Sequence, residues 1–134
     1  MNKIISPTYL GSCRQAAAVL AFVFTSFCQA AEPANTQQEI AHLFTTLESS
    51  NCQFNRNGSW YSAKEASAHL ATKYKYLQGK DLVPSAEKFI ERAATESSLS
   101  GKAYQIKCAD NVAQLSAPWF MAALAKYRAG GKVK

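Results

Sequence analysis

Four stretches of the chain carry apolar side chains at intervals of three and four positions, the spacing that gives a helix one buried face. The pattern predicts helices from about Gln37 to Ser49, from Ser62 to near Gly79, from Pro84 to about Glu96, and from Ser116 through Tyr127. Each predicted helix has about four apolar positions on one face, enough to pack against a common core.

Polar residues mark where three of these helices begin. Thr36 and Glu39 have the spacing of a capping box, in which a hydroxyl caps the helix and the glutamate bonds back to its backbone. Ser62 and Glu65 repeat this spacing before the second helix. Ser85 is placed to cap the third helix.

Short segments between the helices predict strands. Residues 52–56 and 59–61 flank Asn57-Gly58, the strongest two-residue hairpin signal. A third strand is predicted at 104–108, and 110–115 is expected to be a loop. Because two strands alone are rarely stable in water, we expect the third to join the hairpin. The predicted fold is α+β, a small three-stranded antiparallel sheet packed with about four helices.

The first thirty residues have the layout of a secretory signal peptide. Lys3 and Arg14 make the start basic, residues 16–27 carry no charge, and small residues precede a cleavage site after Ala30. The apolar run is too short for a bilayer span, which takes roughly 20 residues. Lipidation or a retained anchor are the alternatives to cleavage.

The predicted mature chain is mildly basic and suits a single domain at 31–130, with a disordered tail at 131–134. Cleavage would remove two of the 15 basic residues and none of the 9 acidic ones, which leaves a net charge of +4. The charges form no clustered stripe, so nucleic acid is not expected as a partner. Dispersed positive charge favours an anionic polymer or an envelope protein, and no transmembrane anchor is expected in the mature chain.

Two cysteines, Cys52 and Cys108, would remain after cleavage. A pair in an oxidising compartment usually forms a disulfide, and these two lack the CxxC spacing and the neighbouring ligands of a redox or metal site. We predict a structural disulfide from the start of the first strand to the end of the third. In an antiparallel sheet those two ends lie side by side.

The segment before the third strand concentrates polar groups, namely Ser97, Ser98, Ser100 and Lys102 around Gly101. Hydroxyls, turn amides and an ammonium group gathered at one place can hold an anion or a carboxylate. The segment lacks a Walker-type pattern, however, and no helix follows its lysine. The structural alternative is a left-handed Gly101 at a helix end, with the serines bonding the last carbonyls.

His69 lies one helical turn from Glu65 and one from Lys73, a position that suits a general base. With a serine of the 97–102 loop as nucleophile, it would make a small envelope-directed hydrolase. The alternative is a structural histidine at the edge of an apolar face. The only other histidine, His42, has no acidic cluster nearby, so no metal and no cofactor are expected.

The hairpin carries a second candidate site. Arg56 precedes the turn and Trp60 and Tyr61 follow it, which predicts a basic and aromatic recognition tip. The alternative is that one of the two adjacent aromatic residues packs under a helix. A third pattern, Ser85-x-x-Lys88, has the spacing found in penicillin-binding enzymes, but the partner motifs of that class are absent.

Three stretches together resemble the YfeK-like family of small secreted bacterial proteins, a family defined as a domain of unknown function. They are Phe54-x-Arg56-Asn57-Gly58-x-x-Tyr61-x-x-x-Glu65-Ala66-x-x-His69-Leu70, Ala86-Glu87-x-Phe89-Ile90, and Ser97-Ser98-x-Ser100-Gly101-Lys102-x-Tyr104. The resemblance runs from about Asn51 to Arg128. It implies a Gram-negative periplasmic protein and carries no established activity, so it assigns no functional residues.

The sequence therefore predicts a non-enzymatic periplasmic module that binds an anionic or polar envelope partner, with the small hydrolase as the alternative. The candidate binding residues are Arg56, Trp60, His69, Ser97, Ser98, Ser100 and Lys102.

Overall fold

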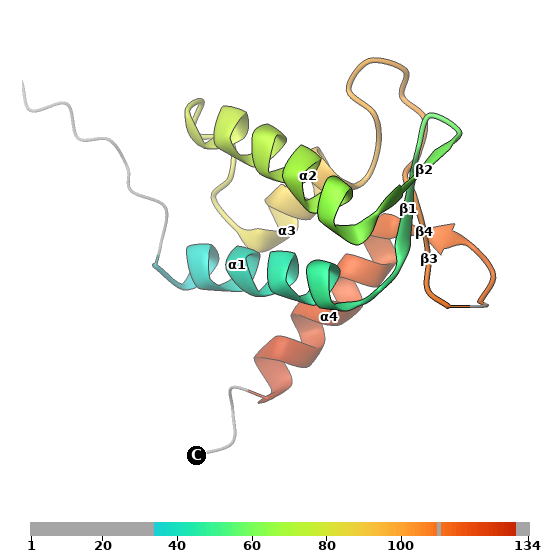
Figure 1. Ribbon diagram of the computed structural model, residues 1–134. Coiled ribbons are helices and arrows are strands. Elements are labelled where there is room, and N and C mark those ends of the chain that lie inside the picture. The colour runs from blue at the N-terminus through green and yellow to red at the C-terminus, as the bar shows by residue number, and fades with distance from the viewer. Residues whose placement is uncertain (1–33, 110, 131–134) are drawn as a thin grey trace, which may run out of the picture.

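The structure is a computed structural model that describes residues 34–109 and 111–130 (Figure 1). Its elements, in chain order, are α1 (Ala34–Ser49), β1 (Gln53–Arg56), β2 (Ser59–Ser62), α2 (Ala63–Gln78), α3 (Ala86–Phe89), the π-helical turn η1 (Ile90–Ala94), β3 (Gln105–Lys107), β4 (Gln114–Leu115) and α4 (Ser116–Gly130). The fold is α+β, as predicted. The predicted signal peptide at 1–30 and disordered tail at 131–134 lie outside the described residues.

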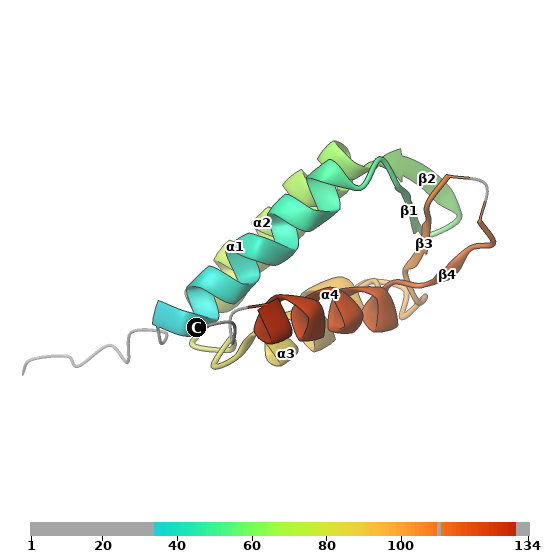
Figure 2. The same ribbon diagram turned by 90° about the horizontal axis from the view of Figure 1, so that it is seen from below.

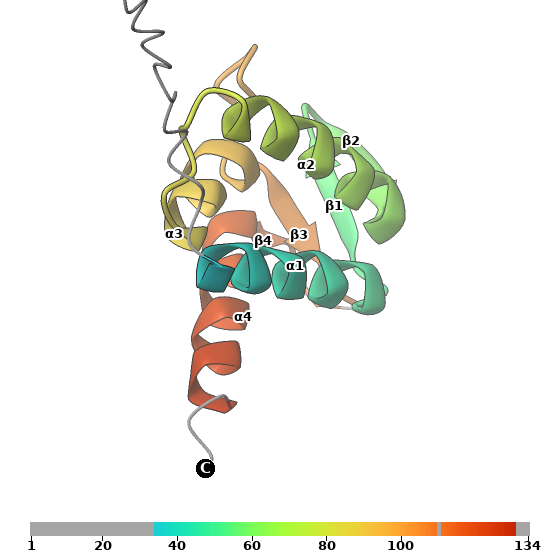
Figure 3. The ribbon, with the colours of Figure 1, turned by 90° about the vertical axis from the view of Figure 1, so that its left-hand side faces the viewer.

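The helices form two layers, and the sheet lies across the end where the layers diverge (Figure 2). α1 packs against α2 in one layer, α3 and η1 pack with α4 in the other, and α1 also contacts α4 and α3. In Figure 3 the strands appear behind α1 and α2. None of the helices in the described ranges is both long and apolar enough to cross a membrane.

The core lies between the layers and against one face of the sheet. Its largest fully buried side chains are Ile40, Leu43, Leu47, Phe54, Leu70, Phe89, Ile90, Tyr104, Ile106, Phe120 and Leu124. Most occupy the apolar helix faces predicted from the sequence, and burying side chains of this size contributes roughly 1.5–3 kcal/mol each. The core therefore comes mainly from the helices, because the strands are short.

The sheet is antiparallel, with strand order β2-β1-β3-β4. Phe54 lies opposite Tyr61 on one side and Ile106 on the other, so these three side chains share the inner face. Alternation along a strand places Arg56 on that same face and Trp60 on the outer one. The predicted disulfide, Cys52–Cys108, is present at the paired ends of β1 and β3.

The sheet has four strands, so the predicted count of three is wrong. Gln114 and Leu115, expected in a loop, form β4 and pair with Ile106 and Gln105. A strand of two residues is too short to show the alternation of apolar and polar side chains that predicts a strand. Its pairing depends on the position of β3. The third helix also ends earlier than predicted, because it passes into η1 and stops at Ala94.

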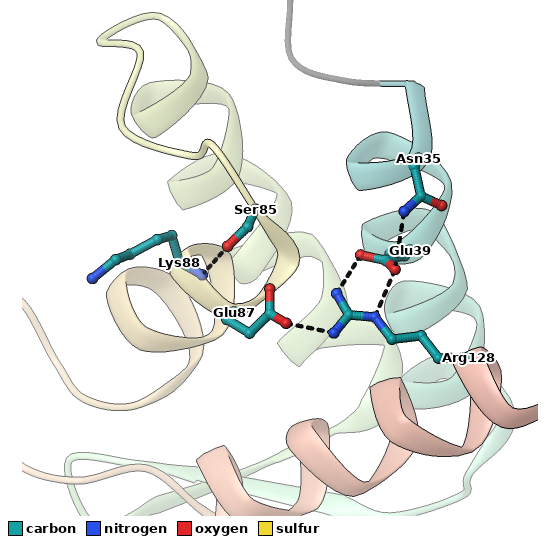
Figure 4. Close-up of polar contacts among 6 residues, drawn as sticks. All are labelled: Asn35, Glu39, Ser85, Glu87, Lys88 and Arg128. Atoms are coloured by element: carbon teal, nitrogen blue, oxygen red, sulfur yellow. Dashed lines mark hydrogen bonds and ion pairs between the residues drawn. The ribbon is translucent and has the colours of Figure 1, made fainter.

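The predicted capping box at Thr36 is wrong as well. α1 begins at Ala34, so Thr36 lies inside the helix, where it is buried. Glu39 instead accepts two hydrogen bonds from Arg128, on Oε1 at 2.7 Å and on Oε2 at 2.8 Å, and Glu87 accepts a third (Figure 4). A charged bidentate hydrogen bond is stronger than the neutral bond of a helix cap. Glu39 therefore binds Arg128, which links α1 to α4 and, through Glu87, to α3.

Candidate functional site: a cationic cleft

A cleft of about 450 Å³ lies where the β1–β2 hairpin, α2 and residues 97–104 meet, and it is called the cationic cleft below. Figure 1 shows residues 97–103, the serine loop, rising beside the tip of the hairpin. The polar side chains that line the cleft include Arg56, His69, Lys73, Ser97, Ser98 and Tyr104. A smaller pocket of about 170 Å³ shares Arg56, Tyr61 and His69 with it and is also lined by Glu65.

The hairpin places Arg56 in the cleft. Asn57 (φ 55°) and Gly58 (φ 92°) both have positive φ, as the tight turn predicted from Asn-Gly requires. The turn sets Arg56 opposite Ser59, and both residues line the cleft. The guanidinium also lies over the Tyr61 ring, with Cζ 4.9 Å from the ring centroid. This contact holds the guanidinium against the inner face of β2.

α2 contributes His69 and Lys73, which are four residues apart and therefore on one face of the helix. The predicted capping box at the start of α2 is confirmed: the Ser62 hydroxyl accepts the Glu65 N–H at 3.3 Å, and the Glu65 carboxylate accepts the Ser62 N–H at 2.9 Å. The buried Leu70 anchors the helix to the core. The cap and the core thus fix where the two basic side chains point.

The serine loop is closed by backbone hydrogen bonds. The Ser97 N–H donates to the Lys102 carbonyl at 2.9 Å and the Gly101 N–H donates to the Ser97 carbonyl at 2.8 Å, above a bridge between Glu96 and Ala103. Gly101 has φ 67°, the left-handed conformation that the structural alternative predicted. Gly101 lies in the turn of the loop and does not cap a helix, because η1 ends at Ala94.

Asn57 joins the hairpin turn to the serine loop. Its Nδ2 donates to Ser97 Oγ at 3.4 Å, and Ser100 Oγ donates to its Oδ1 at 2.6 Å. Ser97 Oγ also accepts the Ser100 N–H at 3.4 Å. Two segments some forty residues apart in the chain are therefore held together at the rim of the cleft.

Tyr104 forms the floor of the cleft. Its N–H donates to the Thr95 carbonyl at 2.8 Å, and its own carbonyl accepts the Ser116 N–H at 3.0 Å. The side chain is 1% exposed, and its ring centroid lies 5.2 Å from that of Phe54. Burial raises the pKa of Tyr104 above 10.0, whereas the charge of Arg56 and a hydrogen bond with Ser97 lower it.

His69 is bonded at both ring nitrogens. Arg56 Nη1 donates to Nδ1 at 2.5 Å, and Nε2 lies 3.4 Å from the Tyr104 hydroxyl. A guanidinium can only donate, so Nδ1 carries no proton and the neutral ring is protonated at Nε2. Burial, then the positive charges of Arg56 and Lys73, hold the pKa of His69 below 6.5. The hydrogen bond from Arg56 requires the neutral imidazole, and the lowered pKa favours that form.

Lys73 completes the basic lining. Its Nζ donates to the Glu96 carbonyl at 3.0 Å and lies 5.2 Å from the centroid of the Tyr104 ring. Burial lowers the pKa of Lys73 below 10.5, and the Glu96 carboxylate raises it. Because Lys73 is half-buried, its surroundings screen its charge less than water would, and the charge attracts an anion more strongly.

Among the described residues, the lining of the cleft has two cationic side chains and no carboxylate. In the described part of the chain, the ion pairs are made by Lys88 and by Arg128, both on other elements. Arg56 and Lys73 therefore make no ion pair with another described residue, and the Glu96 carboxylate acts on Lys73 only at longer range. Such an arrangement attracts an anion.

The structure brings together four of the seven predicted binding residues. Arg56, His69, Ser97 and Ser98 line the cationic cleft. Ser100 lies at its rim and bonds Asn57. Lys102 does not line it.

Trp60 lies on the outer face of the sheet, where the Lys107 Nζ is 4.9 Å from a ring centroid. Arg56 and Trp60 therefore point to opposite faces of the hairpin and do not form one recognition tip. Tyr61 is the aromatic residue that turns inward, toward α2. The alternation along β2 allows either Trp60 or Tyr61 to face inward. The position of α2 over one face of the sheet decides that Tyr61 does.

Lys73 and Tyr104 line the cleft but were not predicted to bind, and Tyr61 was predicted only as part of the hairpin tip. The four-residue spacing from His69 was a signal for Lys73, since it puts both on one helix face. The alternation of 104–108 was read as a strand, and nothing in it indicates that the Tyr104 hydroxyl meets α2. That contact depends on the packing of β3 against the hairpin and on η1.

A hydrolase based on His69 requires a serine hydroxyl within about 2.6–3.2 Å of the imidazole. The ring nitrogens instead bond Arg56 and Tyr104, and Ser100 donates to Asn57. The nitrogen facing Arg56 cannot accept a serine proton while the guanidinium holds it. The observed geometry therefore favours binding over nucleophilic catalysis.

Comparison with known families decides where the chain belongs. A profile described as a family of unknown function, DUF5329, matches residues 34–128. The chain belongs to this family. The matched residues run from α1 into α4 and include every segment that lines the cleft. Neither the curated proteins nor the solved structures contain a match to the chain.

Proposed function

We propose that this DUF5329 protein is a non-enzymatic binding module of the bacterial envelope, and that its cationic cleft holds an anionic group of its partner. The observation that carries the proposal is the pair Arg56 and Lys73, two cations that line one cleft in which no other described lining residue carries a carboxylate. The neutral His69 and the buried Tyr104 add hydrogen-bonding groups between them.

The construction of the cleft supports binding rather than general surface charge. Binding sites combine concave shape, apolar walls and a few polar groups held in fixed positions. Arg56 is fixed by His69 and Tyr61, and the serine loop is fixed by Asn57. A preformed site loses less conformational freedom when it binds, which favours affinity.

The location is part of the same proposal. The signal-peptide layout of residues 1–30, the resemblance to the YfeK-like family and the Cys52–Cys108 disulfide all favour the Gram-negative periplasm. An anionic polymer or an acidic envelope protein is the partner class that suits the cleft.

The test is capture from a detergent-solubilised envelope extract with residues 31–134 as bait, disulfide intact. The double variant Arg56→Gln/Lys73→Gln removes both cleft cations. The matched control Lys64→Gln/Lys80→Gln makes the same change in net charge at exposed residues outside the cleft. We expect the cleft variant to lose a captured component that the wild type and the control retain, with the melting temperatures compared in parallel. Equal capture by both variants would contradict the proposal.

A further inference from the structure

The charge of the cleft also indicates the class of anion. A single carboxylate offers one negative charge and two oxygens, which one guanidinium fork satisfies. Here a guanidinium and an ammonium, from β1 and α2, line the same cleft, and neither makes an ion pair with another described residue. A dianion balances the charges of both cations, whereas a single carboxylate balances the charge of one.

Residues with N–H or O–H groups line the cleft from three segments of the chain, which suits a tetrahedral group better than a planar one. Arg56 comes from the hairpin, Lys73 from α2 and Ser98 from the serine loop. A phosphate monoester has three terminal oxygens and accepts several charge-assisted hydrogen bonds at once. The cleft is also roomy enough for more than the phosphate, since its volume of about 450 Å³ lies within the range of about 300–1,000 Å³ usual for ligand pockets.

We propose that the cationic cleft binds a phosphate monoester, bridged between Arg56 and Lys73 with Ser98 at its third side. This inference rests on the proposed function, because it specifies which anionic group the cleft takes. The monoester can belong to a soluble metabolite or to a lipid headgroup, and both present the same dianion.

His69 provides an internal reporter for the bound group. The titratable and charged groups around its ring are Arg56 on β1, Tyr61 on β2, Glu65 and Lys73 on α2, and Tyr104. Burial lowers the pKa of His69, and the charges of Arg56 and Lys73 lower it further. A dianion between them opposes that effect, so the pKa of His69 should rise when phosphate binds.

The experiment is a titration of residues 31–134 followed by NMR at fixed ionic strength. The probes are inorganic phosphate, glycerol 2-phosphate, acetate, and phosphatidylcholine vesicles with and without phosphatidic acid. We expect either phosphate probe or the phosphatidic acid vesicles to bind at least about tenfold tighter than acetate, and the His69 ring resonances to titrate at higher pH in the complex. The arm that binds most tightly identifies free phosphate, a soluble monoester or a lipid headgroup as the source.

Variants distinguish binding in the cleft from attraction to the overall positive charge of the protein. Arg56→Gln and Lys73→Gln should each weaken phosphate binding by about tenfold or more, since hydrogen bonds to charged groups contribute about 1.5–3 kcal/mol. Lys64→Gln is the matched control on the same helix. Arg56→Lys keeps the positive charge and tests whether a loss of binding in Arg56→Gln comes from a folding defect. It should bind phosphate more tightly than Arg56→Gln.

Two outcomes would overturn the inference. Acetate binding as tightly as every phosphate probe would show that the cleft takes a carboxylate, in which case the proposed function stands and only the phosphate assignment falls. Equal losses in Lys73→Gln and Lys64→Gln would show diffuse attraction instead of a site, and would count against the proposed function too.

Discussion

The guanidinium of Arg56 donates a hydrogen bond to Nδ1 of His69 at 2.5 Å. A cation held against a neutral base, without an ion pair to another described residue, is an unusual resting arrangement for an arginine. It keeps the imidazole in one tautomer and leaves the positive charge of Arg56 available to a ligand. Most of what the cleft can do follows from this pair.

Stability should depend on pH through His69. The pKa of this histidine is lowered on folding from its ordinary 6.5, so the unfolded chain binds more protons near and below pH 6.5. The free energy of unfolding should therefore fall as the pH drops from about 7 through the lowered pKa. His69→Gln should flatten this part of the profile, as measured by urea denaturation between pH 7.5 and 5. The control His42→Gln changes a histidine on α1, outside the cleft. An identical slope in wild type and His69→Gln would contradict the assignment.

Asn57→Gly should loosen the serine loop without breaking the hairpin. Glycine tolerates the positive φ of position 57, but it removes the side chain that bonds Ser97 and Ser100. We expect faster hydrogen exchange at the amides of residues 98–102, and unchanged exchange in β1 and β2. Loss of protection in the strands as well would mean that the turn itself needs the asparagine.

Arg128→Met should lower the free energy of unfolding at pH 7 by about 2 kcal/mol, because it leaves the Glu39 carboxylate without its partner. The Glu39 side chain is only 5% exposed. Arg128 also lowers the pKa of Glu87 to about 2, so this contribution is present above pH 4.5 and is lost as the pH falls toward 2.

Chemical denaturation at pH 7 and at pH 2 measures the effect of Arg128→Met. The exposed Arg92→Met serves as control and should change stability by less than about 0.5 kcal/mol. A difference between wild type and Arg128→Met that is as large at pH 2 as at pH 7 would rule out the ion pairs as its cause.

The double variant Cys52→Ser/Cys108→Ser should lose about 4 kcal/mol of stability. The disulfide closes a loop of 56 residues, and the chain-entropy model assigns a constraint of about this size to such a loop. For a small domain this is a large share of a net stability of roughly 5–15 kcal/mol. Guanidinium denaturation of wild type with and without reductant should reproduce the difference. A loss below about 1 kcal/mol would show that the sheet pairing holds β1 and β3 together unaided.

Local signals in the sequence were sufficient for much of the fold. The Asn57-Gly58 turn, the Ser62–Glu65 cap, the Ser85 cap and the disulfide are all present as predicted. Each depends on residues close in sequence or on a simple pairing rule. The Thr36–Glu39 box had the same local signal and failed, because Arg128 offers Glu39 a stronger partner from α4.

By itself, then, the sequence determined the α+β class, the helix faces, the hairpin and the pairing of Cys52 with Cys108, since periodicity and turn chemistry act over a few residues. It also pointed to Arg56, His69 and the serine loop. Only the tertiary structure decided that Trp60 faces outward, that Lys73 and Tyr104 belong to the cleft, and that Arg56 contacts His69. Those contacts join β1, α2 and the segment after η1, and their geometry depends on how the whole core packs.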